Sequence, residues 1–566
     1  MLLTHHLRRR RLLKTLALAP LASALAACGD SGLAPELDAA PALPATPPND
    51  LQAFQHGVAS GDPLAEAVIL WTRVTPPAGS HADVPVTLTL ARDPAMTDLL
   101  RTEALAATAA RDYTVKHDAT GLVAGQTYYY RFTALGQTSP TGRTRTAPRT
   151  SERLRFALAS CAKFHKAHWN SYAAIAAADV DAVIHLGDYL YEESSKGEAI
   201  VGRALTPDIE VYTLAEYRDR HQFFKRDPDL QELHRQHPMI AIWDDHELAD
   251  NCHYNGAHRH FEEQHGPWRE RVRAAVRSYD EWMPIRTQPT PPSKEAFERI
   301  YRTLPYGDLV DVICIDARYI GRDPEVQSPS SDTQRPADRT AVNDPDRNLL
   351  GVDQREWLFE QLKGSTARYK LIANSVMFGQ LHAAAGLKAA GGGTILNGDQ
   401  WDGYRAEQNR VLEFIRAESI ENVIVLTGDI HSAWAIDLTD DPHNPAVYQP
   451  AVGNTLAPEA LRAVAVEFVC PGIGSEAGTT LGSLIPVAQQ VNRHIRYAQG
   501  GEERGWVLVD VEAARAQAEW FFAVENAERN PAMASGPRWQ LASGTRQLQP
   551  GGAASAARAD APRPAP

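Results

Sequence analysis

The stretch VDAVIHLGDYLYEE, residues 180–193, joins a largely hydrophobic run to a turn that is rich in polar groups. The run from Val180 to Leu186 lacks the regular polar alternation of a half-exposed strand, which predicts a strand buried on both faces. Gly187 then indicates a turn, and Asp188 and Tyr191 follow it. Taken alone, this pattern is equally typical of a strand that ends in an ordinary capped turn, so its function depends on what other segments bring beside it.

The chain repeats this pattern from about residue 150 onwards. Solid apolar strands alternate with helical stretches, as in LRFALASC (154–161), MIAIWDDHE (239–247) and VIVLTGDIH (423–431). Such strands need a layer of structure on each face. The pattern therefore predicts a layered α/β domain over residues 150–530.

Residues 51–148 follow a different pattern. Short segments of alternating polarity, such as VPVTLTLARD (84–93) and TYYYRFTAL (127–135), are separated by glycine and proline turns. This spacing predicts a small all-β sandwich of the immunoglobulin or fibronectin type. The expected fold is thus an α/β domain preceded by a β-sandwich.

The first 28 residues are interpreted as a signal peptide that is no part of the fold. RRRLLK (9–14) resembles the twin-arginine export motif, and LAAC (25–28) resembles a lipobox that would attach a lipid to Cys28. The apolar run Leu16–Ala27 is about half of the ~20 residues that a membrane span needs. We expect an exported protein, periplasmic or extracellular, with the twin-arginine machinery as a partner; the ordinary secretory route is the alternative.

Composition indicates which partners the body of the protein suits and where the chain does not fold. The formal net charge of the 566 residues is −13, which argues against a nucleic-acid-binding face. A phosphate ester stays open as a substrate, because acidic side chains can collect metal ions that supply positive charge. Residues 29–50 predict a flexible linker, and residues 531–566 predict a disordered tail.

Four predicted strands end in side chains that bind metals. They supply Cys161; Asp188 and Tyr191; Asp244, Asp245, His246 and Glu247; and Asp429 and His431. Each group alone is ordinary, because a cysteine packs as a small hydrophobe and a carboxylate caps a helix. Since functional groups in α/β sheets gather beyond the carboxyl ends of the strands, the repetition predicts that these side chains converge. Thiolate and phenolate ligands suit Fe³⁺, oxygen ligands suit Ca²⁺, and a carboxylate shared by two metals is typical of phosphate-ester hydrolysis.

These segments resemble the PhoD-like alkaline phosphatase/phosphodiesterase family of the metallophosphoesterase superfamily. The resemblance covers roughly residues 52–525 and keeps the order of the family's motifs. It rests on FQHGVASGDPLAEAVILWTRV (54–74), LASCAKF (158–164), HLGDYLYE (185–192), WDDHELADN (243–251), YRTLPYGDLVDVICIDAR (301–318), DQWDGY (399–404) and LTGDIHSAW (426–434). The fold that it implies is the layered α/β sandwich of metallophosphoesterases.

The resemblance also implies roles for individual residues. It implies an iron ion held by Cys161, Asp188, Tyr191 and His431, and a calcium ion held by Asp188 as the bridge with Asp245, Asn251 and Asp429. A metal-bound hydroxide or oxide would attack phosphorus, and His246 would protonate the phosphate or the leaving group. Arg318 could hold a phosphate oxygen through a bidentate contact, and Asp402 is a further candidate ligand.

Several neighbouring residues have simpler interpretations. We expect His185 to belong to the core or to support the site, and Glu192 and Glu193 to be solvated. Lys163 is either a partner for phosphate charge or a solvated loop residue. Cys252 is either an additional ligand or a side chain that packs under its loop.

Two other functions remain open at this point. A phospholipase D-like diesterase acting at a membrane surface would use the same metal site, and neither monoesters nor diesters are favoured as substrates. A non-catalytic, lipid-anchored envelope binding protein would not need the ligands to converge. Its side chains could lie more than ~10 Å apart, whereas metal ligands lie about 2.0–2.6 Å from their ion.

The export route can be tested directly. Replacing Arg9 and Arg10 together by lysine should block export, because the twin-arginine motif requires the arginine pair. Fractionation of cells that express the two chains measures the effect. Unchanged export would indicate the ordinary secretory route.

Overall fold

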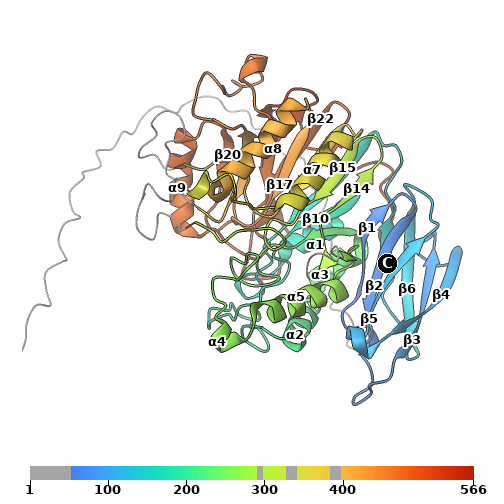
Figure 1. Ribbon diagram of the computed structural model, residues 1–566. Helices are drawn as coiled ribbons and strands as arrows, with labels where there is room; N and C mark the ends of the chain where they lie inside the picture. The colour runs from blue at the N-terminus through green and yellow to red at the C-terminus, as the bar shows by residue number, and fades with distance from the viewer. Residues whose placement is uncertain (1–51, 290–297, 327–340, 383–396) are drawn as a thin grey trace, which may run out of the picture. The chain divides into compact units, whose positions relative to one another are not determined.

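The computed structural model describes residues 52–566 except for 290–297, 327–340 and 383–396. The predicted signal peptide and linker therefore lie outside the described residues. Two large sheets with their helices form the α/β part, and a smaller sheet is formed by the N-terminal strands (Figure 1). None of the described helices combines the length and the apolar character needed to cross a membrane.

The larger sheet has ten strands, and its middle contains the strand at residues 182–186. β9, β10 and β11 run parallel, with Val183 of β10 paired to Ala157 on one side and to Met239 on the other. In sheet order the strands are β24 (Leu548–Pro550), β23 (Met533–Ala542), β22 (Arg515–Ala523), β21 (Gly505–Glu512), β9 (Arg153–Ala159), β10 (Ala182–Leu186), β11 (Met239–Ile242), β1 (Val58–Leu64), β2 (Ala67–Arg73) and β5 (Thr114–Thr120).

The second sheet has seven strands, four of which run parallel. In order these are β14 (Arg302–Tyr306), β15 (Val310–Cys314), β16 (Tyr369–Ala373), β17 (Val423–Thr427), β19 (Ala465–Val469), β18 (Ala433–Leu438) and β20 (Ile495–Gln499). The parallel run is β15, β16, β17 and β19. The connections from β15 to β16 and from β16 to β17 are crossovers, as parallel pairing requires.

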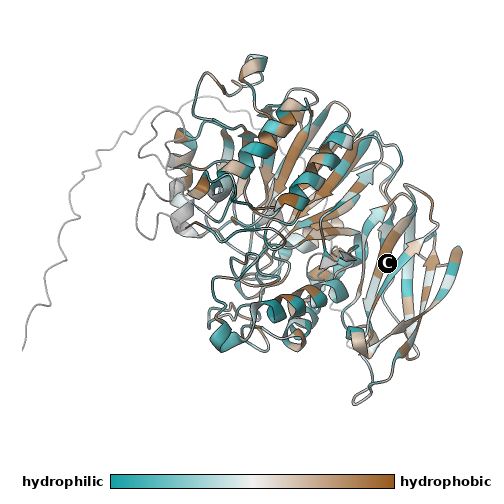
Figure 2. Ribbon diagram, viewed as in Figure 1, coloured by the Kyte–Doolittle hydropathy of each residue, from teal (hydrophilic) through white to brown (hydrophobic). Residues whose placement is uncertain are grey.

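Alternate residues of the second sheet face two different cores. Val312 and Leu426 pack in the core that the two sheets share, whereas Ile313 and Val425 pack in an outer core with α7 (Val352–Gly364) and α8 (Arg405–Ala417). Figure 2 shows the consequence, with hydrophobic strands inside and helices of mixed polarity over them. The prediction of strands buried on both faces is confirmed, because a sandwich of layers covers each sheet.

Further helices cover the ten-stranded sheet and extend the shared core. Ile175 of α1, Leu233 of α3 and Val272 of α5 belong to the same buried cluster as the central strands. A capping box between Thr213 and Glu216 begins α2. The remaining helices are α1 Asn170–Ala177, α2 Leu214–Phe224, α3 Pro228–Gln236, α4 Glu262–His265, α5 Trp268–Trp282 and α9 Gly478–Val491. Short 3₁₀ turns lie at Gln52–Phe54, Ala109–Arg111, Phe164–Lys166, Trp401–Tyr404 and Glu459–Leu461. β12 (Gln288–Pro289) and β13 (Glu298–Arg299) form a separate antiparallel pair.

The N-terminal β-strands form a sandwich that is continuous with the α/β part. One layer is the sheet of β3 (Val84–Ala91), β4 (Leu99–Ala107), β6 (Thr127–Ala134), β7 (Gln137–Thr138) and β8 (Gly142–Arg145). The other layer is β1, β2 and β5, and Leu70 packs with Leu88 and Phe132 in the core between the layers. Since β1 pairs in parallel with β11 through Gly61 and Met239, this second layer is also the end of the ten-stranded sheet.

The prediction of a disordered tail over residues 531–566 is wrong. β23 and β24 complete the edge of the ten-stranded sheet, where β23 pairs along β22. Beyond them, Arg558 donates hydrogen bonds to Asp179 and Asp181, and Ala565 is buried. Composition was misleading because this segment is stabilised by pairing to an existing strand rather than by an apolar pattern of its own.

Arg302 and Asp62 join the two sheets through a buried ion pair that can be tested. Nε and Nη2 of Arg302 each lie 2.7 Å from a carboxylate oxygen of Asp62. Arg302→Met should lower the free energy of unfolding by about 3–5 kcal/mol, because it leaves a buried carboxylate unpaired. Urea unfolding measures the change.

The matched control is Arg92→Met. It breaks the pair with Asp98, in which both side chains are about half exposed. The expected loss is under ~1 kcal/mol. Equal losses in the two variants would contradict a special role for the buried pair.

Candidate metal centre

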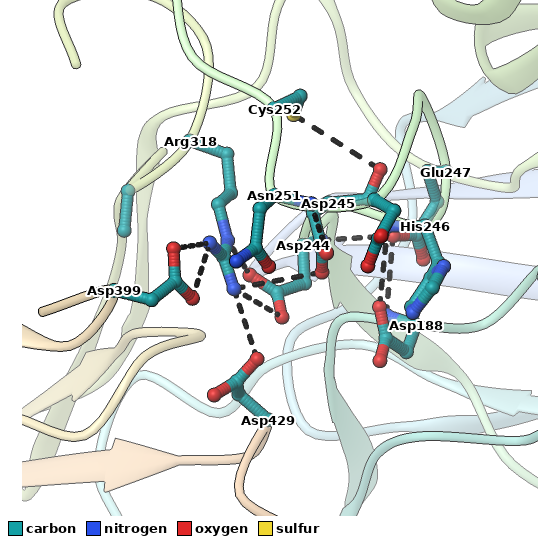
Figure 3. A network of polar contacts seen from close by, with 12 residues as sticks. Asp188, Asp244, Asp245, His246, Glu247, Asn251, Cys252, Arg318, Asp399 and Asp429 are labelled. Atoms are coloured by element: carbon teal, nitrogen blue, oxygen red, sulfur yellow. Dashed lines mark hydrogen bonds and ion pairs between the residues drawn. The ribbon is translucent and has the colours of Figure 1, made fainter. Parts of the chain in front are cut away.

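The ends of four strands from both sheets meet at one place. Cys161 follows β9, Asp188 follows β10, Asp245 follows β11 and Asp429 follows β17. Ligand atoms within 4.8 Å of one another form three clusters: Cys161, Asp188 and His431; Asp188, Asp245 and His246; and Asp244, Asp245 and Asp429. Figure 3 shows the carboxylates of the last two clusters turned toward a common centre. A non-catalytic binding protein would not need these side chains to converge.

The backbone at these strand ends is strained. Five of the predicted ligands have a left-handed conformation, namely Cys161 (φ 57°), Asp188 (φ 55°), Asn251 (φ 48°), Asp429 (φ 59°) and His431 (φ 54°). Non-glycine residues rarely adopt this conformation, which costs on the order of 1–3 kcal/mol each. Strain concentrated in one set of residues indicates a functional site.

Two glycines allow the strand ends to approach so closely. A Cβ atom at Gly187 would lie 2.5 Å from Cβ of Asp244, and one at Gly428 would lie 2.7 Å from Cβ of Ser160. Gly187 also has a φ of 102°. The glycine turn noted in the sequence is therefore required for the clusters to form.

Tyr191 adjoins the first cluster, so that thiol, carboxyl, imidazole and phenol groups lie together. The Tyr191 hydroxyl donates a hydrogen bond to Asp188 Oδ2 at 2.9 Å, and it lies 2.7 Å from Ser475 Oγ. Burial raises the pKa of the Cys161 thiol and of the Tyr191 phenol well above their ordinary values, and the Asp188 charge adds to both shifts. Desolvation lowers the pKa of His431 to about 3, so its imidazole is neutral, as a metal ligand must be. A cation is what would stabilise the anionic forms of Cys161 and Tyr191.

The second cluster contains a buried oxygen that lacks a hydrogen bond. Asp245 Oδ2 accepts a hydrogen bond from the Asn251 N–H at 2.7 Å. Asp245 Oδ1 is buried and has no hydrogen-bond partner among the described residues; the nearest cation is Arg318 Nη2 at 3.5 Å. A buried carboxylate oxygen without a partner is costly unless a cation binds it. The residues of both clusters therefore fit metal ions.

The burial and contacts of Arg318 do not support the prediction that it holds a phosphate oxygen. Its side chain has no exposed surface, and its N–H groups donate to Asp244, Asp399 and Asp429. An arginine has five N–H donors, and these contacts use all of them. Arg318 therefore stabilises the carboxylates instead of facing a substrate.

His246 belongs to the second cluster, and other side chains hold its ring on two sides. Its Nδ1 lies 2.7 Å from Glu192 Oε2, and its ring stacks on Tyr191 with 4.2 Å between centroids. Burial alone would lower the pKa of His246, but the charges of Asp245, Glu192 and Asp188 outweigh it and raise that pKa. The raised pKa favours the protonated imidazole beside the predicted ligands.

Several sequence interpretations change at this site. Glu192 and Glu193 are buried rather than solvated, and Glu193 pairs with Lys163, whose ammonium lies 5.3 Å from the Tyr191 ring centroid. Asp402 lies outside the clusters, where it pairs with Arg405. Cys252 is fully buried, with Sγ 4.0 Å from the Asp245 carbonyl, which is consistent with packing under its loop.

Two residues support the site in roles that the sequence did not indicate. Glu247 accepts hydrogen bonds from the backbone N–H groups of Asp188, Tyr189 and Asp244, so it ties the end of β10 to the end of β11. Gln400 donates from Nε2 to Asp429 Oδ2 at 2.5 Å. Both lie within quoted motifs, WDDHE and DQWDGY, but their neighbours carried the more obvious ligand chemistry.

Comparison with known proteins relates this chain to one family. Residues 156–520 match the family described as "PhoD-like phosphatase", and residues 39–148 match "PhoD-like phosphatase, N-terminal domain". Alkaline phosphatase D of Bacillus subtilis (strain 168) is 33% identical over 416 residues, which are 72% of this chain and 68% of that protein. The solved structure described as "Structure of PhoD" has a TM-score of 0.75 at 28% identity and covers 89% of this chain and 93% of its own. Sequence and fold thus agree over most of the chain.

The close approach at Gly187 leads to a prediction. Gly187→Ala should lower both the melting temperature and the metal content, because the added Cβ meets Asp244 and pushes the end of β10 away from the end of β11. Calorimetry and elemental analysis measure the two effects.

Gly197→Ala is the matched control. Gly197 also has a positive φ, of 79°, but a Cβ there would meet nothing within 4 Å. It should cost only the ~1 kcal/mol of the unfavourable backbone conformation and leave the metal content unchanged. Equal metal loss in both variants would contradict the proposed role of close approach.

Proposed function

Because the chain belongs to the PhoD-like phosphatase family, whose members are phosphoric ester hydrolases, we propose that it cleaves phosphate esters at a centre of iron and calcium ions. The observation that carries the proposal is the convergence of Cys161, Asp188 and His431 with the carboxylates of Asp245 and Asp429. Strand ends from two different sheets supply these groups, at a cost in backbone strain. A purely structural role would not require that cost.

The donor sets support two different ions. Cys161, Asp188, Tyr191 and His431 offer thiolate, carboxylate, phenolate and imidazole, a set that suits Fe³⁺. Asp188, Asp245, Asn251 and Asp429 offer oxygen atoms, which suit Ca²⁺. Asp188 would be shared, since it belongs to two of the clusters. When bound, such ions would withdraw charge from the phosphoryl oxygens and acidify a bound water.

The chain itself would supply the proton for the leaving group. His246 is held by Glu192 at 2.7 Å, and Glu192 also accepts the Asp250 N–H at 2.8 Å, so the carboxylate is fixed from two sides. The His246 side chain keeps 13% of its surface exposed, which leaves an edge open to a substrate. We therefore assign His246 as the proton donor and Glu192 as the residue that positions it.

The proposal extends to the location of the enzyme. A twin-arginine signal in residues 1–28 would deliver it, folded, to the periplasm or the exterior, and lipidation of Cys28 would anchor it there. This part is supported by the sequence motifs alone.

The central test is the activity of the purified, metal-analysed protein. It should contain iron and calcium and hydrolyse p-nitrophenyl phosphate, bis-p-nitrophenyl phosphate or both at alkaline pH, and the ratio of the two rates measures its preference. Asp188→Ala should abolish activity and release metal, because the shared carboxylate is lost. Asp98→Ala, an exposed position, is the control. Metal-loaded protein that cleaves neither ester would refute the proposed function.

The role of His246 predicts a dependence on the leaving group. His246→Ala should lower kcat/KM by about 10²–10⁴-fold for phenyl esters, which need protonation to leave, and by much less for p-nitrophenyl esters. Glu192→Gln should show the same pattern more weakly. Glu198→Gln, on the same loop but 63% exposed, should behave as wild type. An equal loss with both leaving groups would argue against a proton donor.

A further inference from the structure

A buried guanidinium lies among four carboxylates, namely those of the third cluster and that of Asp399. Arg318 Nε lies 2.5 Å from Asp244 Oδ1, Nη1 lies 2.7 Å from both oxygens of Asp399, and Nη2 lies 2.9 Å from Asp429 Oδ1. Nη2 is also 3.5 Å from Asp245 Oδ1. The guanidinium stands between Asp399, Asp244 and Asp429 in Figure 3. None of these contacts involves a position at which a substrate could bind, because the side chain is fully buried.

The contacts divide the four carboxylates into two kinds. Asp244 and Asp399 each accept hydrogen bonds from Arg318 with both oxygens. Asp429 is only partly engaged by Arg318, and Asp245 keeps an oxygen without a hydrogen bond among the described residues. Asp245 Oδ1 is thus free to bind an added cation, and Asp429, whose oxygens each accept one hydrogen bond, from Arg318 and from Gln400, keeps further lone pairs for it.

Charge explains why this division matters. Four carboxylates in contact would carry a charge of −4, a site that strongly prefers highly charged ions. One fixed guanidinium removes a unit of that charge and lies within hydrogen-bonding distance of three of the four. Arg322 contacts only Asp399 among them, at 2.5 Å, so it cannot replace Arg318.

We propose that Arg318 is a positioning residue that sets the charge and the geometry of the cation site at Asp245 and Asp429, so that this site selects a divalent over a trivalent ion. The inference rests on the proposed metal centre and adds a determinant of its selectivity. Arg318 acts through the carboxylates and touches no reacting atom.

The test measures ion selectivity in the full-length, iron-containing protein after chelation of its labile divalent ions. Ca²⁺ and Tb³⁺ compete for the site, with Tb³⁺ luminescence as the signal. Arg318→Gln removes one positive charge, so the site attracts every cation more strongly, and the gain in attraction is larger for a trivalent than for a divalent ion. We expect the Tb³⁺/Ca²⁺ affinity ratio to rise at least about tenfold. Visible absorption from an iron phenolate at Tyr191 reports whether the variant has folded with its first cluster intact.

Two further variants separate charge from shape. Arg318→Lys keeps the charge but loses the planar fork, so Ca²⁺ affinity should fall about 10–100-fold with the ratio unchanged. Arg322→Gln removes a charge that contacts Asp399 alone and should change the ratio little. If Arg318→Gln does not fold, wild-type Ca²⁺ affinity in Arg318→Lys would by itself overturn the proposal.

The outcomes also distinguish this inference from the proposed function. Wild-type protein that binds neither ion would overturn the metal centre and the inference together. Wild-type binding with an unchanged ratio in Arg318→Gln would overturn the inference alone and leave the proposed hydrolase standing.

Discussion

Buried negative charge at the meeting edge of the two sheets is the constraint on which the site depends. Asp188, Asp244, Asp245 and Asp399 lie buried there, and Asp429 is partly buried, with 16% of its side chain exposed. Such a group of carboxylates is stable only when cations or donors neutralise it. Arg318 supplies one internal cation, and Asp245 retains an oxygen that an added ion would satisfy. The requirement for metal therefore follows from charge balance as well as from ligand type.

The same edge concentrates backbone strain, and the surrounding structure stabilises it. Left-handed conformations at Asp188 and Asp429 place their carboxylates at the centre, while Glu247 and Gln400 hold those positions through hydrogen bonds. The central strands of both sheets are buried on both faces, so their ends cannot relax independently. The packed layers thus maintain a site geometry that the isolated loops would not adopt.

Much of this arrangement could be predicted from the sequence, and the failures have physical causes. The family, the α/β layers and the β-sandwich are confirmed, because unalternated strands and ordered motifs are local properties of the chain. The prediction of a disordered tail over residues 531–566 is wrong, because β23 is stabilised by pairing with β22 rather than by an apolar pattern of its own. The prediction that Glu192 is solvated is wrong for a similar reason, since its partner His246 lies 54 residues away in the sequence.

The sequence by itself determined which chemical groups are available and that each follows a buried strand, because strand periodicity and side-chain identity are local. Only the tertiary structure decided how those groups share their charges. Arg318 looks suited to phosphate in the motif CIDAR, yet three distant carboxylates occupy its N–H groups. Contacts of this kind depend on which strand ends meet across the two sheets, and that is set by the packing of the whole core rather than by any single segment.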